Sequence, residues 1–296
     1  MPSPTFIGIG AQKAGTTWLF SMVAQHPDVV SGKRKELHYF NLPTRHGRPR
    51  EWYEGEFDVP SDGVRGRAVG ECTPAYLWTT GDPTALEGEL HVLGVADRVA
   101  ALYGPDKGHD LRLIVCLRHP VDRAISAINE IVKKGPRFGL RPALSIREAV
   151  HRRPSVVEKG RYASNLKAWL RHFPRQAFLF FVYEQDILPD TAKRATLHCV
   201  FQHIGVDPSF EPVGLTDRKN RRLRPFDIRA RHAGRFKRHA LRLVPSALRD
   251  HPAWDFPGDP EGEQWLWSVY EPEIQALEEL LGRPLPWAPP QVASNL

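Results

Sequence analysis

The chain has 296 residues, of which 41% are hydrophobic and 25% are charged. This is the composition of an ordinary globular protein, and the length suits one large α/β domain or two small ones. Lys and Arg number 41 against 34 Asp and Glu, so the formal net charge is +7. The basic excess favours anionic partners such as nucleotides, acidic sugars, nucleic acid or anionic lipid, without choosing among them.

The N-terminal segment and the cysteines set expectations for the compartment. The first residues lack a charged stretch followed by a long apolar one, so no signal peptide is expected. No apolar run approaches the roughly 18 residues of a membrane span. The three cysteines make no disulfide framework, and no Cys or His cluster has zinc spacing. We therefore expect a cytoplasmic protein in a reducing environment, without a metal site.

Apolar runs and helical patterns alternate along the chain. Four short apolar runs bounded by turn residues predict buried strands: Phe6–Gly10, Ala68–Glu71, Leu111–Leu117 and Phe178–Tyr183. Helical patterns follow or separate them: Thr16–His26, Pro83–Tyr103, Pro120–Lys134, Arg161–His172, Thr191–Ile204 and Glu263–Leu281. Residues 41–62 and 215–225 are predicted to be loops. The alternation predicts an α/β fold, a single domain over residues 1–296 with a central parallel sheet flanked by helices.

A glycine-rich segment joins the first predicted strand to the first predicted helix. It reads Gly10-Ala-Gln-Lys-Ala-Gly-Thr-Thr17. The glycines allow a sharp turn and a close approach of the backbone to a ligand. The start of the following helix offers unpaired N–H groups and a positive dipole end, which together form an anion site. Hydroxyl groups of Thr16 and Thr17 can add donors. A glycine-rich turn without a ligand is the structural alternative.

This loop differs from that of the nucleotide triphosphatases, G-x-x-x-x-G-K-[ST]. Gly10 and Gly15 have the required separation, but Thr16 stands where the lysine is expected. The lysine comes earlier, as Lys13. The strand at 111–117 is followed by Arg118, where an ATPase is expected to place a metal-binding Asp. The pattern therefore favours a phosphate loop that works without a metal.

A second candidate anion site lies after the third predicted strand. Arg118 follows that strand at its carboxyl end, where ligands bind in this architecture. Ser126 lies about two turns into the next helix. A guanidinium group with a nearby hydroxyl suits a terminal phosphate. An ordinary ion pair of Arg118 with Asp122 is the alternative, and we expect Arg123 to be a solvated helix residue.

These two segments, in this order, resemble the nucleotide-binding motifs of PAPS-dependent sulfotransferases, where PAPS is 3′-phosphoadenosine 5′-phosphosulfate. The resemblance continues through Thr73-Pro-Ala-Tyr76, residues 161–174 and Tyr183-Glu-Gln-Asp186, so it covers most of the chain. It is strongest to the carbohydrate-type enzymes, including the heparan sulfate enzymes and their bacterial relatives. The resemblance implies a P-loop-like sulfotransferase fold and PAPS as donor, with PAP as the desulfated product and no metal.

The resemblance also implies a set of donor-binding residues. The 5′ side of the donor is expected to contact the first loop, and the 3′-phosphate the second motif. The residues are Lys13, Ala14, Gly15, Thr16, Thr17 and Trp18, then Arg118 and Ser126, and finally Tyr162, Asn220 and Arg221. Tyr162 has core packing against Trp169 as its alternative. The basic loop at 215–225, expected to cover the donor, has a solvated charged loop as its alternative.

The acceptor side centres on Lys33-Arg-Lys-Glu-Leu-His-Tyr-Phe-Asn41. Glu36 and His38 are two residues apart, so an extended segment would place both on one side. The resemblance implies that Glu36 is the general base, supported by His38, with Lys13 stabilising the leaving phosphate. From the residues alone, Glu36 could equally form a surface ion pair with the neighbouring basic residues. His38 could equally be a packed, hydrogen-bonded histidine. Glu71, which follows Ala68-Val-Gly, is expected to orient acceptor groups. Cys72 is a departure, because heparan-type enzymes commonly have a lysine there.

The expected function is in-line transfer of a sulfuryl group to a hydroxyl or amine of a carbohydrate or small molecule. Four aromatic residues form either an acceptor wall or core: Trp52, Tyr53, Tyr76 and Trp78. The rival functions are a kinase or NTPase, a non-catalytic nucleotide binder and a nucleic-acid-binding protein. The last is prompted by the basic stretch 218–249, which has no interleaved aromatic platform, so no nucleic-acid partner is expected. The acceptor and the oligomeric state cannot be derived from the sequence.

Overall fold

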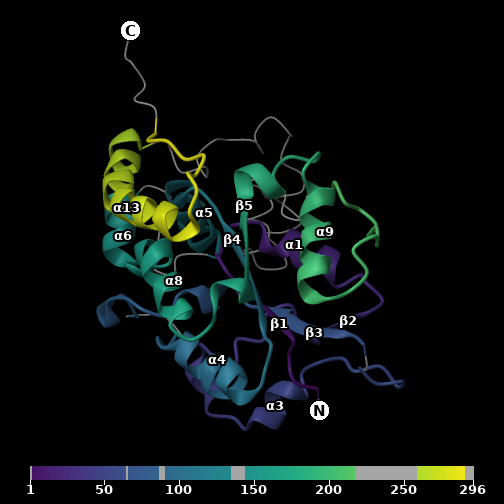
Figure 1. Ribbon diagram of the computed structural model, residues 1–296. Helices are drawn as coiled ribbons and strands as arrows, with labels where there is room; N and C mark the ends of the chain where they lie inside the picture. The colour runs from purple at the N-terminus through teal and green to yellow at the C-terminus, as the bar shows by residue number, and fades with distance from the viewer. Residues whose placement is uncertain (1, 65, 87–90, 135–143, 218–258, 291–296) are drawn as a thin grey trace, which may run out of the picture.

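Parallel strands form the centre of the molecule in the computed structural model, which describes residues 2–64, 66–86, 91–134, 144–217 and 259–290. The five strands are β1 (Phe6–Gly10), β2 (Val29–Ser31), β3 (Ala68–Cys72), β4 (Arg112–Leu117) and β5 (Phe178–Val182), in the order β2-β3-β1-β4-β5 (Figure 1). All neighbours are parallel, with Phe6 opposite both Gly70 and Arg112. The four predicted strands are confirmed. The fifth strand, β2, was missed because three residues are too few for a pattern.

Helices and short turns connect the strands. The α-helices are α1 (Thr16–Val23), α2 (Pro43–His46), α3 (Arg50–Glu54), α4 (Val95–Tyr103), α5 (Pro120–Lys134), α6 (Ile146–Arg152), α7 (Ser155–Glu158), α8 (Tyr162–Leu170), α9 (Lys193–Ile204) and α13 (Pro260–Leu281). Turns of 3₁₀ helix are η1 (Pro74–Leu77), η2 (Pro83–Leu86), η3 (Pro105–Lys107) and η5 (Arg175–Ala177), and η6 (Tyr183–Ile187) is a π-turn.

One predicted helix and one predicted loop need correction. The segment expected to be one helix over 83–103 is a 3₁₀ turn at its start, and α4 begins only at Val95, after the left-handed residue Gly94. The segment 41–62, expected to be a loop, contains α2 and α3. In both places Pro and Gly residues set where the short helices begin and end, and the spacing of apolar residues does not show these boundaries.

The helices cover both faces of the sheet (Figure 1). On one side, α1 packs against α9, and both lie against the strands. On the other side lie α5 and α8, over which the long helix α13 packs. Arg123 of α5, expected to be solvated, is instead fully buried, and its guanidinium donates to the carbonyl of Val156. None of the helices in the described ranges has the length and apolar character that crossing a membrane requires.

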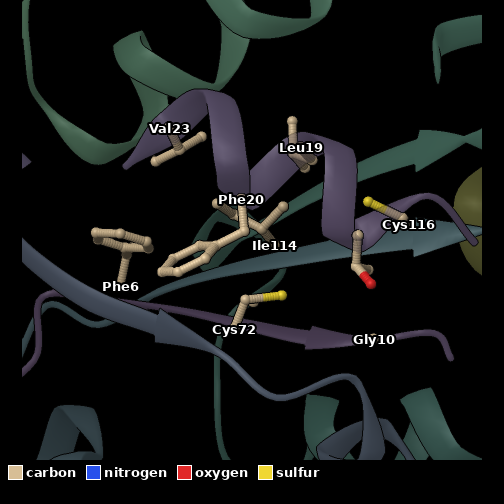
Figure 2. Close-up of a pocket in the computed structure, with 10 residues that line it drawn as sticks. Phe6, Gly10, Leu19, Phe20, Val23, Cys72, Ile114 and Cys116 are labelled. Carbon is tan, nitrogen blue, oxygen red and sulfur yellow. The ribbon is translucent and has the colours of Figure 1, made fainter. Parts of the chain in front are cut away.

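The contact between α1 and the sheet is apolar and tight. Figure 2 shows side chains of α1 above those of the strands, around a cavity of only about 10 Å³; the labelled residues are Phe6, Gly10, Leu19, Phe20, Val23, Cys72, Ile114 and Cys116. Burying a side chain such as Leu19 or Phe20 stabilises the fold by roughly 1.5–3 kcal/mol. The helix start is therefore held firmly against the carboxyl ends of β1 and β4.

The topology brings two loops to the same edge of the sheet. β1 and β4 are adjacent and parallel, so the residues that follow them emerge side by side. From β1 the chain crosses towards β2, and from β4 it crosses towards β5, in opposite directions along the sheet. Such a reversal opens a crevice at the carboxyl ends of the strands, where ligands bind in α/β proteins.

Candidate active site

The loop between β1 and α1 is shaped by Gly15. This residue is the N-cap of α1 and has φ 84°, a left-handed conformation that side chains other than glycine rarely adopt. A Cβ atom on it would lie 2.8 Å from Ile187 Cγ2 and 2.9 Å from Tyr183 Cδ2. No side chain caps the helix, and its first turn contains no acidic residue. The N-terminus of α1 therefore keeps the positive character of an anion site.

Other predicted loop residues have structural roles. Ala14 is fully buried, and its N–H donates to the carbonyl of Ala11 within the turn. Thr16 is buried under the loop. The indole of Trp18 is also buried; its Nε1 donates to the carbonyl of Leu215 at 2.9 Å. The structure thus places Trp18 between α1 and the segment that precedes residue 218, and does not direct it into the loop.

Lys13 connects the loop to α5. It has φ 70°, and its ammonium lies 2.5 Å from Glu130 Oε2. The Lys13 side chain is 28% exposed, so the ammonium is partly accessible. Ser126 is half-buried on the same helix, one turn before Glu130. Residues four apart lie on one face of a helix, so Lys13 reaches the face of α5 that carries Ser126.

Arg118 reaches the same loop from β4. Its Nη1 donates to the carbonyl of Lys13 at 3.0 Å, and the guanidinium lies over the ring of Tyr183 at 4.9 Å from the ring centre. The group is therefore directed at the loop and not into an ion pair with Asp122, the alternative that the sequence left open. Arg118 Nε is buried and has no hydrogen-bond partner among the described residues.

The Arg118 backbone is also fixed. The hydroxyl of Tyr162 donates to the Arg118 carbonyl at 3.0 Å, and Tyr162 itself is buried, which raises the pKa of its hydroxyl. Tyr162 is therefore buried and bonded to the backbone of Arg118, and its direct contact with a donor stays a prediction. Glu184 accepts the N–H of His119 and the indole N–H of Trp287, both at 3.0 Å. Glu184, two residues after the end of β5, was not among the predicted site residues.

Asn220, Arg221 and the rest of the basic loop beyond residue 217 lie outside the described residues. Their predicted part in covering the donor stays a prediction. Within the described ranges, no three His, Cys, Asp or Glu side chains gather as metal ligands would.

Glu36 and His38 meet on the other side of the loop. Glu36 Oε2 lies 3.1 Å from His38 Nε2, and Glu36 Oε1 lies 2.7 Å from Lys35 Nζ. The predicted juxtaposition is confirmed, but its cause differs: the segment is not a strand, and His38 has φ 52°. Lys35 Nζ also donates to Thr17 Oγ1 at 2.8 Å. Glu36 is therefore joined to the start of α1 through one ammonium group.

Two opposing effects set the pKa of Glu36. Burial raises it, whereas hydrogen bonds from His38 and Lys35, and the positive charges of both, lower it. The net result is a pKa below the usual value of 4.5. Glu36 is therefore ionised at neutral pH, as a proton acceptor must be.

A chain of hydrogen bonds sets the tautomer of His38. The carbonyl of Trp78 can only accept a hydrogen bond, so His91 Nε2 donates to it at 2.9 Å. In the neutral ring, His91 Nδ1 is then an acceptor. That nitrogen accepts from Asn41 Nδ2 at 3.1 Å, which turns Asn41 Oδ1 towards His38 Nδ1, also at 3.1 Å. His38 Nδ1 therefore carries a proton. His38 Nε2 faces Glu36 Oε2 at 3.1 Å, and Glu36 Oε1 is held by Lys35 at 2.7 Å.

A buried carboxylate positions this segment. Glu71 at the end of β3 is fully buried and accepts four hydrogen bonds: from Leu37 N–H at 3.2 Å, Thr73 Oγ1 at 2.5 Å, Tyr76 Oη at 2.8 Å and Tyr53 Oη at 3.2 Å. Burial raises the pKa of Glu71 more than these hydrogen bonds lower it. Glu71 was expected to orient acceptor groups, but it faces the interior and acts only through the residues bound to it.

The residues around Glu71 hold the neighbouring backbone as well. Thr73 Oγ1 accepts the N–H of His38 at 3.2 Å, and the hydroxyl of Tyr76 accepts the N–H of Tyr39 at 2.8 Å. Three successive N–H groups of the acceptor segment are thus fixed by one short stretch of chain. Tyr53, Tyr76 and Trp78 are buried, so for these three the core alternative is correct.

Known proteins similar in sequence to this chain are sulfotransferases. Residues 3–207, more than two thirds of the chain, match the family profile described as "Sulfotransferase domain". A mouse heparan sulfate glucosamine 3-O-sulfotransferase 3B1 is 31% identical over 181 residues, covering 60% of this chain and 40% of that protein. Mouse heparan sulfate glucosamine 3-O-sulfotransferase 6 is 32% identical over 180 residues, covering 60% and 46%. The matching part therefore spans less than half the length of these relatives.

Solved structures share the fold. A sulfotransferase from Alicyclobacillus acidocaldarius superposes with a TM-score of 0.64 at 23% identity, covering 96% of this chain and 98% of that one. The sulfotransferase domain from the curacin biosynthetic pathway has a TM-score of 0.50 at 15% identity and covers 96% and 99%. At these identities the likeness shows a common architecture of sheet and flanking helices.

Proposed function

The chain belongs to the sulfotransferase family, and from that premise we propose that it transfers the sulfuryl group of PAPS to a hydroxyl or amine of a carbohydrate or small molecule. The relatives named for heparan sulfate glucosamine 3-O-sulfation favour a sugar hydroxyl as the first acceptor to test. PAPS is a co-substrate in this reaction, because it is consumed and released as PAP.

One observation carries the proposal: Arg118 Nη1 lies 3.0 Å from the carbonyl of Lys13. This contact brings the loop after β1 and the motif after β4 to one place. A donor with a 5′-phosphosulfate and a separate 3′-phosphate needs cations at two points within one site. Lys13 and Arg118 supply them from adjacent strand ends, and a guanidinium is well suited to bind a terminal phosphate.

The residues present fit such a donor. The left-handed turn at Gly15 and the uncapped start of α1 suit the 5′ side. Arg118 Nε, buried without a partner among the described residues, would gain one from a phosphate oxygen. Ser126 lies on the face of α5 reached by Lys13 and offers a hydroxyl for the 3′ side. Lys13 would leave Glu130 to neutralise the charge on the leaving phosphate.

Glu36 would take the proton of the acceptor. The acceptor oxygen or nitrogen forms the new bond to sulfur, while the bond between sulfur and the 5′-phosphate oxygen breaks and its electron pair leaves with PAP. The proton lost by the acceptor passes to Glu36. Because the pKa of Glu36 lies below its usual value, the active ionised form persists down to acidic pH, and the rate falls as the pH drops through that lowered pKa.

The experiment is a transfer assay with sulfur-labelled PAPS and a panel of acceptors, beginning with N-sulfated heparan oligosaccharides and including small hydroxyl and amine compounds. Support comes from a labelled product, identified by mass spectrometry, that forms together with PAP and is absent with Glu36→Gln. A parallel assay with ATP and Mg²⁺ tests the kinase alternative. Phosphoryl transfer from ATP, or PAP binding without transfer to any acceptor, would count against the proposal.

A further inference from the structure

Lys35 stands between the two halves of the site. Its ammonium lies 2.8 Å from Thr17 Oγ1 at the start of α1 and 2.7 Å from Glu36 Oε1 on the acceptor side. The side chain is 39% exposed, so the ammonium is open to a ligand. These two contacts occupy two of the three N–H donors of an ammonium group, which leaves one for a further acceptor.

The position of this charge is unusual for a residue in a basic run. Its neighbours Lys33 and Arg34 turn away to the carbonyl of Gly55 at 2.9 Å and the carboxylate of Glu56 at 3.2 Å. Lys35 alone of the three turns towards α1. Burial raises the pKa of the Cys72 thiol, at the end of β3, and the positive charge of Lys35 acts in the opposite direction. A lysine is thus supplied from the acceptor segment beside a strand end that itself carries no cation.

The state of Glu36 shows why Lys35 must move during the reaction. Both carboxylate oxygens of Glu36 are engaged, Oε2 by His38 and Oε1 by Lys35. A base needs a free oxygen within hydrogen-bond distance of the proton that it removes. A new anion beside Thr17 would compete for the ammonium and release Oε1.

We propose that Lys35 is a catalytic residue that contacts the oxygens of the sulfuryl group in transfer, and that donor binding draws its ammonium from Glu36 Oε1. This inference rests on the proposed function. In the transfer, Lys35 stabilises the charge on the sulfuryl oxygens while Glu36 Oε1 receives the acceptor proton. The same movement couples the two sides of the site, because the base becomes available only when the donor is present.

The test compares Lys35→Gln with Lys33→Gln. The second variant removes the same charge two residues earlier in the chain, where the ammonium makes only an exposed contact with the carbonyl of Gly55. Transfer from labelled PAPS gives kcat and KM, and calorimetry with PAP gives the affinity for a ligand that lacks the sulfuryl group. We expect Lys35→Gln to lower kcat about 100-fold, as the loss of one preorganised donor does, and to leave the PAP Kd within about threefold. Lys33→Gln should leave both unchanged, and Lys35→Arg should restore part of kcat.

The pH profile gives a second readout. Removing the cation raises the pKa of Glu36, so the acid limb of kcat/KM should move to higher pH in Lys35→Gln and stay in place in Lys33→Gln. Unchanged kcat in Lys35→Gln overturns the inference. A parallel loss of PAP affinity also overturns it, since Lys35 would then serve donor binding alone. A wild-type protein that neither binds PAP nor transfers sulfate would instead refute the proposed function itself. Thermal unfolding of each variant shows whether it is folded, and Lys35→Arg keeps the test valid if Lys35→Gln is not.

Discussion

The proposed donor side and the proposed acceptor side of the site are held in place in different ways. On the donor side, Lys13 and Arg118 follow adjacent strands within a few residues, and a backbone carbonyl joins them at 3.0 Å. On the acceptor side, Glu36 and His38 lie in a segment without regular structure. That segment is fixed by side chains of Glu71 and Thr73, which lie more than 30 residues further along the chain.

Because of this difference, we expect substitutions on the two sides to change different quantities, donor affinity on one side and turnover on the other. The donor side takes its geometry from the sheet, so we expect the removal of Arg118 to act mainly on donor affinity. The acceptor side takes its geometry from buried hydrogen bonds, so changes remote from any substrate can reduce turnover without reducing donor affinity. Four substitutions test this separation.

The largest effect is expected for Glu36→Gln. The amide cannot accept the acceptor proton, so kcat should fall by about 10³, within the range of a lost general base. PAP affinity should stay within about twofold, because the loop and Arg118 are intact. Transfer kinetics and calorimetry on the same preparation measure both quantities. Comparable turnover in the variant would remove Glu36 from the chemistry.

Arg118→Ala should act on the donor instead. Losing charge-assisted hydrogen bonds to a phosphate costs about 2 kcal/mol, which is about 30-fold in the PAP Kd. Arg112→Ala is the matched control, because Arg112 lies at the opposite end of β4 in an exposed pair with Asp110. Equal PAP affinities for the two variants, measured by calorimetry, would show that Arg118 does not contact the 3′-phosphate.

The local structure around the loop after β1 could be predicted from the sequence, for a physical reason. A buried strand, a glycine turn and a helix start are adjacent in the chain, so their pattern dictates their geometry. The same holds for the four longer strands. The helix α6 was missed because the prediction relied on apolar periodicity. The signal in the sequence was the capping box of Ser145 and Glu148, which marks the start of this helix.

The acceptor side could be predicted only in part. The chemical types of Glu36 and His38 pointed to a base and its partner, but the hydrogen bonds to Glu71, Thr73 and Asn41 depend on the tertiary fold. Lys35 belonged to a charged run, and nothing local distinguishes it from Lys33. Its contact with Thr17 appears only when the segment is folded against α1.

Glu71→Gln tests the remote support of the acceptor side. An amide nitrogen cannot accept the hydrogen bonds that one carboxylate oxygen now accepts, so Leu37 and His38 should lose their fixed positions. We expect kcat to fall about tenfold with PAP affinity unchanged. Thermal unfolding reports any accompanying loss of stability. A variant in which PAP affinity falls as much as kcat would show that the two sides are not separable.

The smallest effect is expected for Glu130→Gln. Glu130 holds the Lys13 ammonium at 2.5 Å and therefore competes with an anionic donor for it. Neutralising that carboxylate should tighten PAP binding about threefold, in the opposite direction to Arg118→Ala. Exposed ion pairs contribute little, which limits the gain. Weaker PAP binding would indicate that Glu130 positions Lys13 for the donor.

The most direct test is calorimetric titration of the wild-type protein with PAP, with adenosine 5′-phosphate as the ligand that lacks the 3′-phosphate. If the ends of β1 and β4 together bind a bisphosphorylated adenosine, PAP should bind at least about tenfold more tightly than adenosine 5′-phosphate, and Arg118→Ala should abolish that preference. Equal affinities for the two ligands, or no heat with PAP, would contradict a donor site built from Lys13 and Arg118.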